Sequence, residues 1–161
     1  MNVFVTVGTT LFDELVAAVD SLAVYEALLA KGFTSIIFQI GRGTYEPKHA
    51  PPALAMSFYR YNTEYKRDIA ATSLVISHAG AGTIMDVLNQ HKHLIVVPNT
   101  KLMDNHQTEL ATALAERKHL LETTIQALPA LVKAMDWTDI VPYPAIDEQA
   151  FPRLVDAVME G

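Results

Sequence analysis

The feature that most constrains the fold is a buried strand joined to a helix by a turn of small residues. Leu74 to Ser77 fit a parallel strand covered on both faces, and apolar residues recur at helical spacing from Thr83 onward. The turn between them, from His78 to Gly82, holds two glycines that let a neighbour approach the backbone. A helix starting here directs free N–H groups and the positive end of its dipole at the same point. The turn therefore predicts a phosphate site in an α/β protein.

Strand and helix patterns alternate along the rest of the chain, which predicts βαβ crossovers and a mainly parallel sheet. With 161 residues, half of them hydrophobic, the chain can bury one core and is too short for two ordinary domains. We therefore expect a single Rossmann-like α/β domain over residues 1–161. The expected strands are 2–7, 35–39, 57–61, 74–77 and 94–97, with a short sixth at 120–121. The expected helices are 12–30, 64–71, 83–89, 105–117, 128–135 and 148–160, the last capped by Asp147.

Two better-known glycine loops do not fit the turn. A dinucleotide fingerprint needs a third glycine where Met85 stands, and the Gly-Lys-Ser/Thr of a P-loop is absent from the sequence. A turn that uses small residues only for packing is the alternative for a bare Gly-x-Gly. The combination with His78, Thr83 and Asp86 favours a ligand site, in which Asp86 can accept hydrogen bonds from a ribose diol.

Two more polar loops follow expected strands, and ligands of open α/β sheets bind beyond the carboxyl ends of the strands. Gly8, Thr9 and Thr10 offer a flexible backbone and two hydroxyl groups to a phosphate, although either threonine could instead cap the following helix. Arg42 lies between two glycines and suits bidentate contact with a diphosphate. A solvated loop arginine is the alternative.

A third polar group opens the helix after Pro98. Asn105, His106 and Gln107 could hydrogen-bond the hydroxyl groups of a sugar. Helix capping by Asp104 or Asn105 is the alternative, and it leaves Gln107 unexplained.

Composition excludes several classes of function. The net charge of −6, from 12 basic and 18 acidic residues, argues against a sequence-independent grip on nucleic acid. The absence of cysteine excludes disulfides and thiolate metal sites. The first residues pass directly into a strand without a signal peptide, and no apolar run approaches the roughly 20 residues that span a bilayer. We therefore expect a cytoplasmic chain without a membrane span.

Several segments together closely resemble the small cytosolic catalytic subunit of the eukaryotic UDP-N-acetylglucosamine transferase that acts on dolichol diphosphate N-acetylglucosamine. They are Phe4-Val-Thr-Val-Gly-Thr-Thr10 with Phe12-Asp13, Gln39-Ile-Gly-Arg-Gly-Thr44, Ile76-Ser-His-Ala-Gly-Ala-Gly-Thr83 and Met103-Asp-Asn-His-Gln107. The match runs in order to about Leu121, and Val141-Pro-Tyr-Pro144 with a short helix resembles the tail of that family. The family is similar to the donor-binding, C-terminal half of family-28 glycosyltransferases of the GT-B fold.

The resemblance implies roles for the site residues. The turn Gly80-Ala81-Gly82-Thr83 would hold the UDP diphosphate, and the backbone around Tyr61 and Asn62 would border the uracil. Asp86 would take the ribose hydroxyls, and His106 with Gln107 would meet the sugar. Relatives commonly have Glu where this chain has Asp86, so the shorter side chain could reach the ribose through a water molecule.

The resemblance also implies a missing half. A GT-B enzyme has two Rossmann-like domains around its active site, and this chain can form one. The acceptor half and the general base would come from a membrane-anchored subunit that recruits this chain to the cytosolic face of the endoplasmic reticulum. His78 is the local candidate for proton transfer, and a structural or phosphate-side role suits it better.

The implied reaction is inverting transfer from UDP-N-acetylglucosamine to a lipid-diphosphate-linked sugar through a β-1,4 bond. Neither a cofactor nor a metal is expected, because a helix dipole and backbone donors can stabilise the departing UDP and no Asp-x-Asp motif occurs. Two alternatives remain. One is a split bacterial-type exopolysaccharide glycosyltransferase, and the other is a nucleotide-sugar-binding module without catalysis.

The expected last helix, 148–160, carries one apolar stripe. Its members are Phe151, Leu154, Val155, Val158 and Met159. Such a stripe usually packs on the chain's own sheet. The resemblance implies that part of this tail contacts the partner subunit.

Overall fold

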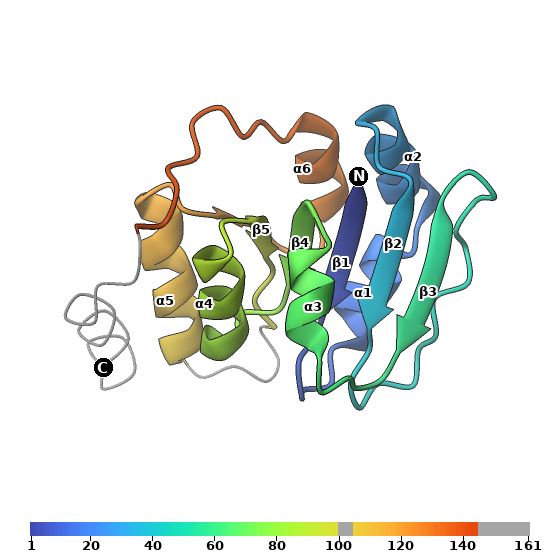
Figure 1. The fold of residues 1–161 in the computed structure, drawn as a ribbon, viewed down its shortest axis with the longest axis horizontal. Helices are drawn as coiled ribbons and strands as arrows, with labels where there is room; N and C mark the ends of the chain where they lie inside the picture. Colours follow the sequence, from blue (N-terminus) through green and yellow to red (C-terminus); the bar gives the residue numbers. More distant parts are fainter. Residues whose placement is uncertain (100–104, 145–161) are drawn as a thin grey trace.

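The computed structural model describes residues 1–99 and 105–144, with the backbone alone for residues 105–107. These residues form one sheet with the strand order β3-β2-β1-β4-β5-β6 (Figure 1). The strands are β1 (Asn2–Thr6), β2 (Ser35–Gln39), β3 (Ala55–Tyr59), β4 (Leu74–Ser77), β5 (His93–Val96) and β6 (Leu121–Glu122). Every neighbouring pair is parallel. The order reverses between β1 and β4, where doubly wound sheets bind ligands, and the expected Rossmann-like fold is confirmed.

Helices cover both faces of the sheet (Figure 1). They are α1 (Asp13–Val19), α2 (Leu22–Ala30), α3 (Tyr65–Ala70), α4 (Ala81–Asn89), α5 (Asn105–Glu116) and α6 (Leu128–Ala134). Because strand side chains alternate between faces, Val3 and Val5 join the core under α1, α2 and α6, while Phe4 joins the core under α3, α4 and α5. Because the central strands bury side chains on both faces of the sheet, their sequences are continuously apolar. None of the helices within the described ranges is long and apolar enough to cross a membrane.

The single helix expected over residues 12–30 is wrong, because the chain breaks at Asp20 and Ser21 into α1 and α2. Ser21 has extended backbone angles and accepts a hydrogen bond from the Val24 amide, as an N-cap residue does. Asp20 is 3% exposed and accepts hydrogen bonds from Tyr25, Tyr45 and the amides of Lys48 and His49. The break therefore turns one carboxylate toward the loop between β2 and β3.

Two boundaries shift in ways that affect the carboxyl edge of the sheet. Strand β3 begins and ends two residues earlier than expected, so that Tyr61 lies with Asn62 in the loop after the strand. Helix α4 begins at Ala81, so that Gly82 and Thr83 belong to its first turn. The expected helix 148–160 and its cap lie outside the described residues.

Candidate functional site

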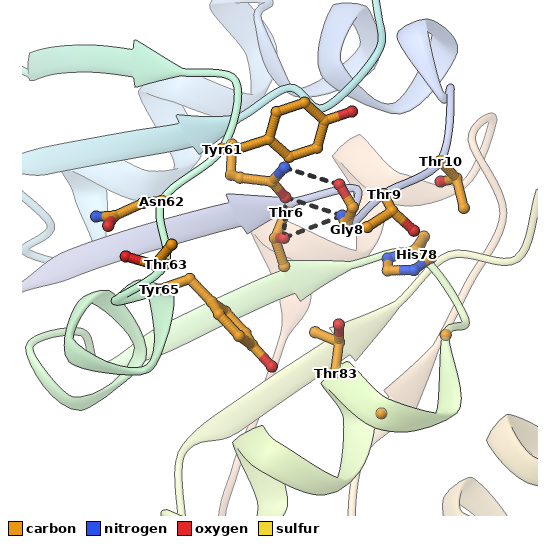
Figure 2. A pocket seen from close by; sticks show the side chains of 13 residues that line it. Thr6, Gly8, Thr9, Thr10, Tyr61, Asn62, Thr63, Tyr65, His78 and Thr83 are labelled. Carbon is orange, nitrogen blue, oxygen red and sulfur yellow. Dashed lines mark hydrogen bonds between the residues drawn. The ribbon is translucent and has the colours of Figure 1, made fainter.

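A cavity of about 500 Å³ opens at the carboxyl edge of the sheet, where the loops after β1, β3 and β4 meet (Figure 2). The residues that line it are Thr6, Gly8, Thr9, Thr10, Gln39, Tyr61, Asn62, Thr63, Tyr65, His78, Gly80, Gly82 and Thr83. The strand order reverses between the paired strands β1 and β4, so the connections that leave these two strands run to opposite sides and leave a space between them at this edge.

The loop after β1 is fixed by the side-chain amide of Gln39, which is 4% exposed. Its nitrogen donates to the carbonyl oxygens of Gly8 at 2.8 Å and Arg60 at 2.7 Å. Its oxygen accepts from the Gly8 amide at 2.8 Å and from the Thr6 hydroxyl. Gly8 has a φ of +63°, which favours glycine. One buried amide therefore ties the ends of β1, β2 and β3 into a rigid floor.

Neither threonine of this loop caps α1. The N-cap residue of that helix is Phe12, and no side chain bonds the helix start. The Thr10 hydroxyl donates to the Val7 carbonyl at 2.7 Å within the loop. Thr9 is exposed and lines the cavity. Of the two alternatives for these residues, capping is wrong, and Thr9 is the one that can still offer its hydroxyl to a ligand.

The imidazole of His78 fills the space between the loops after β1 and β4 (Figure 2). A Cβ atom on Gly8 would lie 2.8 Å from its Cε1 atom, and one on Gly80 would lie 2.3 Å from its Nε2 atom. The ring is thus enclosed by two glycine backbones, and the residue is 7% exposed. Burial lowers the pKa of His78 below its ordinary value. The ring is therefore neutral at pH 7.

The start of α4 presents open backbone to the cavity. Gly80 is the N-cap residue, no side chain bonds this helix end, and no acidic residue lies in the first turn. A Cβ atom on Gly82 would meet nothing within 4 Å. Free N–H groups and the positive end of the helix dipole thus face a space large enough for an anion. The two glycines differ: Gly80 makes room for His78, and Gly82 leaves room for a ligand.

The opposite wall is formed by Tyr61, Asn62, Thr63 and Tyr65. Tyr61 is 54% exposed, and Tyr65 reaches across toward Thr83 (Figure 2). The Tyr65 hydroxyl donates a short hydrogen bond to Oδ2 of Asp86. Burial, followed by this bond, raises the pKa of Tyr65 to about 12.

The structure brings most of the residues expected at the site together. Gly8, Thr9, Thr10, Tyr61, Asn62, His78, Gly80, Gly82 and Thr83 line the cavity. Ala81 contributes the first residue of α4, and Asp86 lies behind Tyr65 without lining the cavity. Asn105, His106 and Gln107 begin α5, and their side chains lie outside the described part of the structure.

Arg42 is exposed and is not among the residues that line the cavity. The arginine that contacts this loop is Arg60, the residue after β3, which donates to the carbonyl oxygens of Gly41 and Gly43. Its guanidinium is therefore used to hold the loop after β2.

Four lining residues were missed from the sequence: Thr6, Gln39, Thr63 and Tyr65. Gln39 carried a signal, because an amide at the end of an apolar strand needs buried partners. Tyr65 carried none, since a tyrosine at a helix start is ordinary. Across the described ranges, no three His, Asp or Glu side chains gather in a way that could hold a metal ion.

Comparison with known proteins places this geometry in a family. Residues 2–157 match the glycosyltransferase family 28 C-terminal domain. The UDP-N-acetylglucosamine transferase subunit ALG13 of Homo sapiens is 48% identical over 130 residues, which cover 78% of this chain and 11% of that protein. The subunit of the same name from Yarrowia lipolytica is 35% identical over 84% of this chain and 71% of its own length. The chain thus spans about a tenth of the human relative and most of the yeast one.

Solved structures agree with the fold. An NMR solution structure of ALG13 superposes with a TM-score of 0.73 at 27% identity, covering 98% of this chain and 96% of that one. MurG of Acinetobacter baumannii gives a TM-score of 0.65 at 18% identity, and the match covers 99% of this chain and 50% of MurG. The MurG likeness concerns the fold alone. From the family match and the yeast relative together, the chain is a member of the glycosyltransferase family 28 C-terminal domain family.

Proposed function

We propose that this chain is the catalytic, donor-binding subunit of a heteromeric N-acetylglucosaminyltransferase. It would transfer N-acetylglucosamine from UDP-N-acetylglucosamine to dolichol-diphosphate-N-acetylglucosamine, the second sugar addition in N-glycan precursor synthesis. The observation that carries the proposal is the open backbone of Gly82 at the uncapped start of α4, inside a cavity of about 500 Å³. The relatives that share the sequence are named as UDP-N-acetylglucosamine transferase subunits.

In the proposed complex the UDP diphosphate lies over Gly82 and Thr83. The N–H groups of the first turn of α4 then point at the oxygens that gain charge as the glycosidic bond to UDP breaks. The uracil lies toward Tyr61 and Asn62, in the loop that follows β3. Gln39 holds the Gly8 loop in place, so the backbone of this loop needs little rearrangement when the charge develops.

The reaction also needs an acceptor substrate and a base that takes the proton of its hydroxyl group. The acceptor hydroxyl oxygen attacks the anomeric carbon from the face opposite UDP, and its proton passes to a base. We assign that base to a membrane-anchored partner subunit, because His78 is 7% exposed and enclosed by two glycines. His78 instead positions the loops after β1 and β4. At the start of α5, Asn105, His106 and Gln107 are proposed to recognise the sugar.

The proposal assigns the whole chain to one donor-binding domain that works in the cytoplasm. The partner holds it at the cytosolic face of the endoplasmic reticulum and supplies the acceptor half of the GT-B active site. Part of the tail, 148–160, is proposed to contact that partner. The match to MurG covers half of the MurG chain, so that chain contains a further part of about equal length.

The test adds the purified chain to microsomes depleted of their own catalytic subunit and follows transfer of labelled N-acetylglucosamine to the lipid acceptor. The wild-type chain should restore the second sugar, and Gly82→Val should lose at least about tenfold of the activity, because its side chain occupies the diphosphate position. Ala23→Val is the matched control, since Ala23 is also exposed at the second position of a helix, far from the cavity.

Other outcomes would contradict the proposal in distinct ways. Binding of UDP without transfer in complemented microsomes would indicate a nucleotide-sugar-binding module. Transfer to a different lipid acceptor would indicate another glycosyltransferase pathway. Full activity of Gly82→Val would contradict the placement of the diphosphate at the start of α4.

A further inference from the structure

The Tyr65–Asp86 pair separates the carboxylate from the cavity. Tyr65, the first residue of α3, lines the cavity, whereas Asp86, in α4, does not. Oδ2 of Asp86 accepts the Tyr65 hydroxyl, and Oδ1 lies 3.7 Å from Nζ of Lys66. Both carboxylate oxygens therefore have partners on α3. The polar group that faces the cavity at this point is the hydroxyl of Tyr65.

This arrangement makes the Tyr65 oxygen an acceptor. A phenol has one proton and two lone pairs, and here the proton is donated to Asp86. Donation to a carboxylate increases the electron density on the phenol oxygen, so it accepts a further hydrogen bond well. A ligand hydroxyl is a donor of the right kind. Because Asp86 does not line the cavity, the direct contact between Asp86 and a ribose that the sequence suggested would require the Tyr65 side chain to move aside.

The position of Tyr65 along the cavity indicates which part of a nucleotide it meets. Thr83 and Gly82 mark the diphosphate end, and Tyr61 with Asn62 marks the end assigned to the base. Tyr65 points at Thr83 from the wall between them (Figure 2). A ribose joins the diphosphate to the base and carries its two free hydroxyls on one side of the ring. Those hydroxyls would therefore pass close to the Tyr65 oxygen.

We propose that Tyr65, oriented by Asp86, recognises the ribose diol and so distinguishes a ribonucleotide from its deoxy analogues. Tyr65 is the group that contacts the ligand, and Asp86 is a positioning residue that fixes the direction of the phenol proton. The inference rests on the proposed function, because it takes the cavity to hold a uridine nucleotide.

The experiment measures the affinities of UDP, 2′-deoxy-UDP and 3′-deoxy-UDP by calorimetry. The wild-type chain should bind UDP about fivefold to tenfold more tightly than at least one deoxy analogue, the effect of one hydrogen bond. Tyr65→Phe should bring that ratio close to one by weakening UDP alone. Tyr59→Phe is the matched control, since the Tyr59 hydroxyl donates a similar short hydrogen bond to Asp68 of α3 but does not line the cavity, so this variant should leave the ratio unchanged.

A second set of variants tests the positioning role of Asp86. Asp86→Asn should lower the ratio, because the amide no longer fixes the phenol proton as a carboxylate does. In the Tyr65→Phe background, Asp86→Glu should restore part of the ratio, since a longer carboxylate can reach the diol directly. A purely structural role for Asp86 would predict equal losses for UDP and both analogues and no such rescue.

The outcomes separate this inference from the function on which it rests. If UDP binds and the ratio survives Tyr65→Phe, the role of Tyr65 is wrong and the nucleotide site stands. If the wild-type chain binds UDP and both deoxy analogues equally, recognition of the diol is wrong. If UDP does not bind the wild-type chain, the proposed function fails together with the inference.

Discussion

Single residues around the cavity have separate tasks that a motif does not reveal. Gly80 and Gly82 stand two positions apart in one turn, yet an added Cβ meets the His78 ring at the first and open space at the second. The ring in turn requires Gly8 on its other side. The Gly-x-Gly pattern therefore combines a packing requirement at Gly80 with open space at Gly82, where we propose that the diphosphate binds.

Alanine at the two glycines should therefore have opposite effects on stability. Gly80→Ala should destabilise the fold by about 1–3 kcal/mol, because its Cβ overlaps the imidazole. Gly82→Ala should be neutral or stabilising by up to about 1 kcal/mol, because alanine is the better helix former. Urea unfolding measures both. In a His78→Ala background the cost of Gly80→Ala should shrink, and an unchanged cost would show that the ring is not the obstacle.

The buried imidazole of His78 should also make stability depend on pH. Because burial lowers its pKa in the native state, the unfolded chain binds more protons once the pH falls below about 6.5. Stability from this group is complete above that pH and is lost as the pH falls toward the lower native pKa. The slope can reach about 1.4 kcal/mol per pH unit.

The measurement is urea unfolding between pH 7.5 and 5.5 for the wild-type chain and His78→Gln. The variant should lose the His78 part of the slope. His93, whose pKa burial also lowers, remains in both proteins and cancels in the difference. Equal slopes in the two proteins would show that His78 takes up its proton as readily in the native state as in the unfolded chain.

At the scale of elements, the loops at the carboxyl edge are held by buried polar side chains. Gln39 joins the ends of three strands, and Arg60 holds the turn after β2. Asp20 accepts hydrogen bonds from the loop between β2 and β3. Burial alone would raise the pKa of Asp20, but the hydrogen bonds that it accepts outweigh burial and lower this pKa. Gly41 of that loop lies against the carbonyls of Gly8 and Thr10. The loop therefore supports one side of the cavity.

Removing the Asp20 carboxylate should loosen this loop. Asp20→Ala leaves the fully buried Tyr25 hydroxyl and two amides without their acceptor, at a cost of at least about 2 kcal/mol. Hydrogen exchange should accelerate at the amides of Lys48 and His49. Tyr45→Phe, which removes one donor and keeps the carboxylate, should cost about 1 kcal/mol and leave those amides protected. Unchanged exchange in Asp20→Ala would show that the loop is held by other contacts.

The elements also show where prediction from sequence succeeds. Apolar runs placed β1, β2 and β4 nearly to the residue, because a strand buried on both faces must be continuously apolar. The helix break at Asp20 was missed, since the donors that bind the Asp20 carboxylate lie 5 to 29 residues away in the sequence. Seven cavity residues, in the loops after β1 and β4, were identified from the motifs of those loops, and Tyr61 and Asn62 were identified from the family resemblance. Tyr65 was missed because its role depends on the distant Asp86.

At the scale of the whole molecule, the described residues form one sheet with a cavity of about 500 Å³ at its carboxyl edge. The match to MurG covers nearly all of this chain and half of the other. The cavity has a floor and walls from the loops after β1, β3 and β4, all on the same edge. Under the proposed function, the diphosphate binds in this cavity and a partner subunit supplies the acceptor.

The most direct test of this account is a titration of the ¹⁵N-labelled chain with UDP, followed by NMR. We predict saturable shifts of the backbone amides of Gly8, Gly82 and Thr83, because the N–H groups at the start of α4 and in the loop after β1 would face the diphosphate. The same titration of Gly82→Val should show no saturation. Shifts centred elsewhere, for example around the smaller cavity lined by His119 and Trp137, or no shifts at all, would contradict the assignment of the donor site.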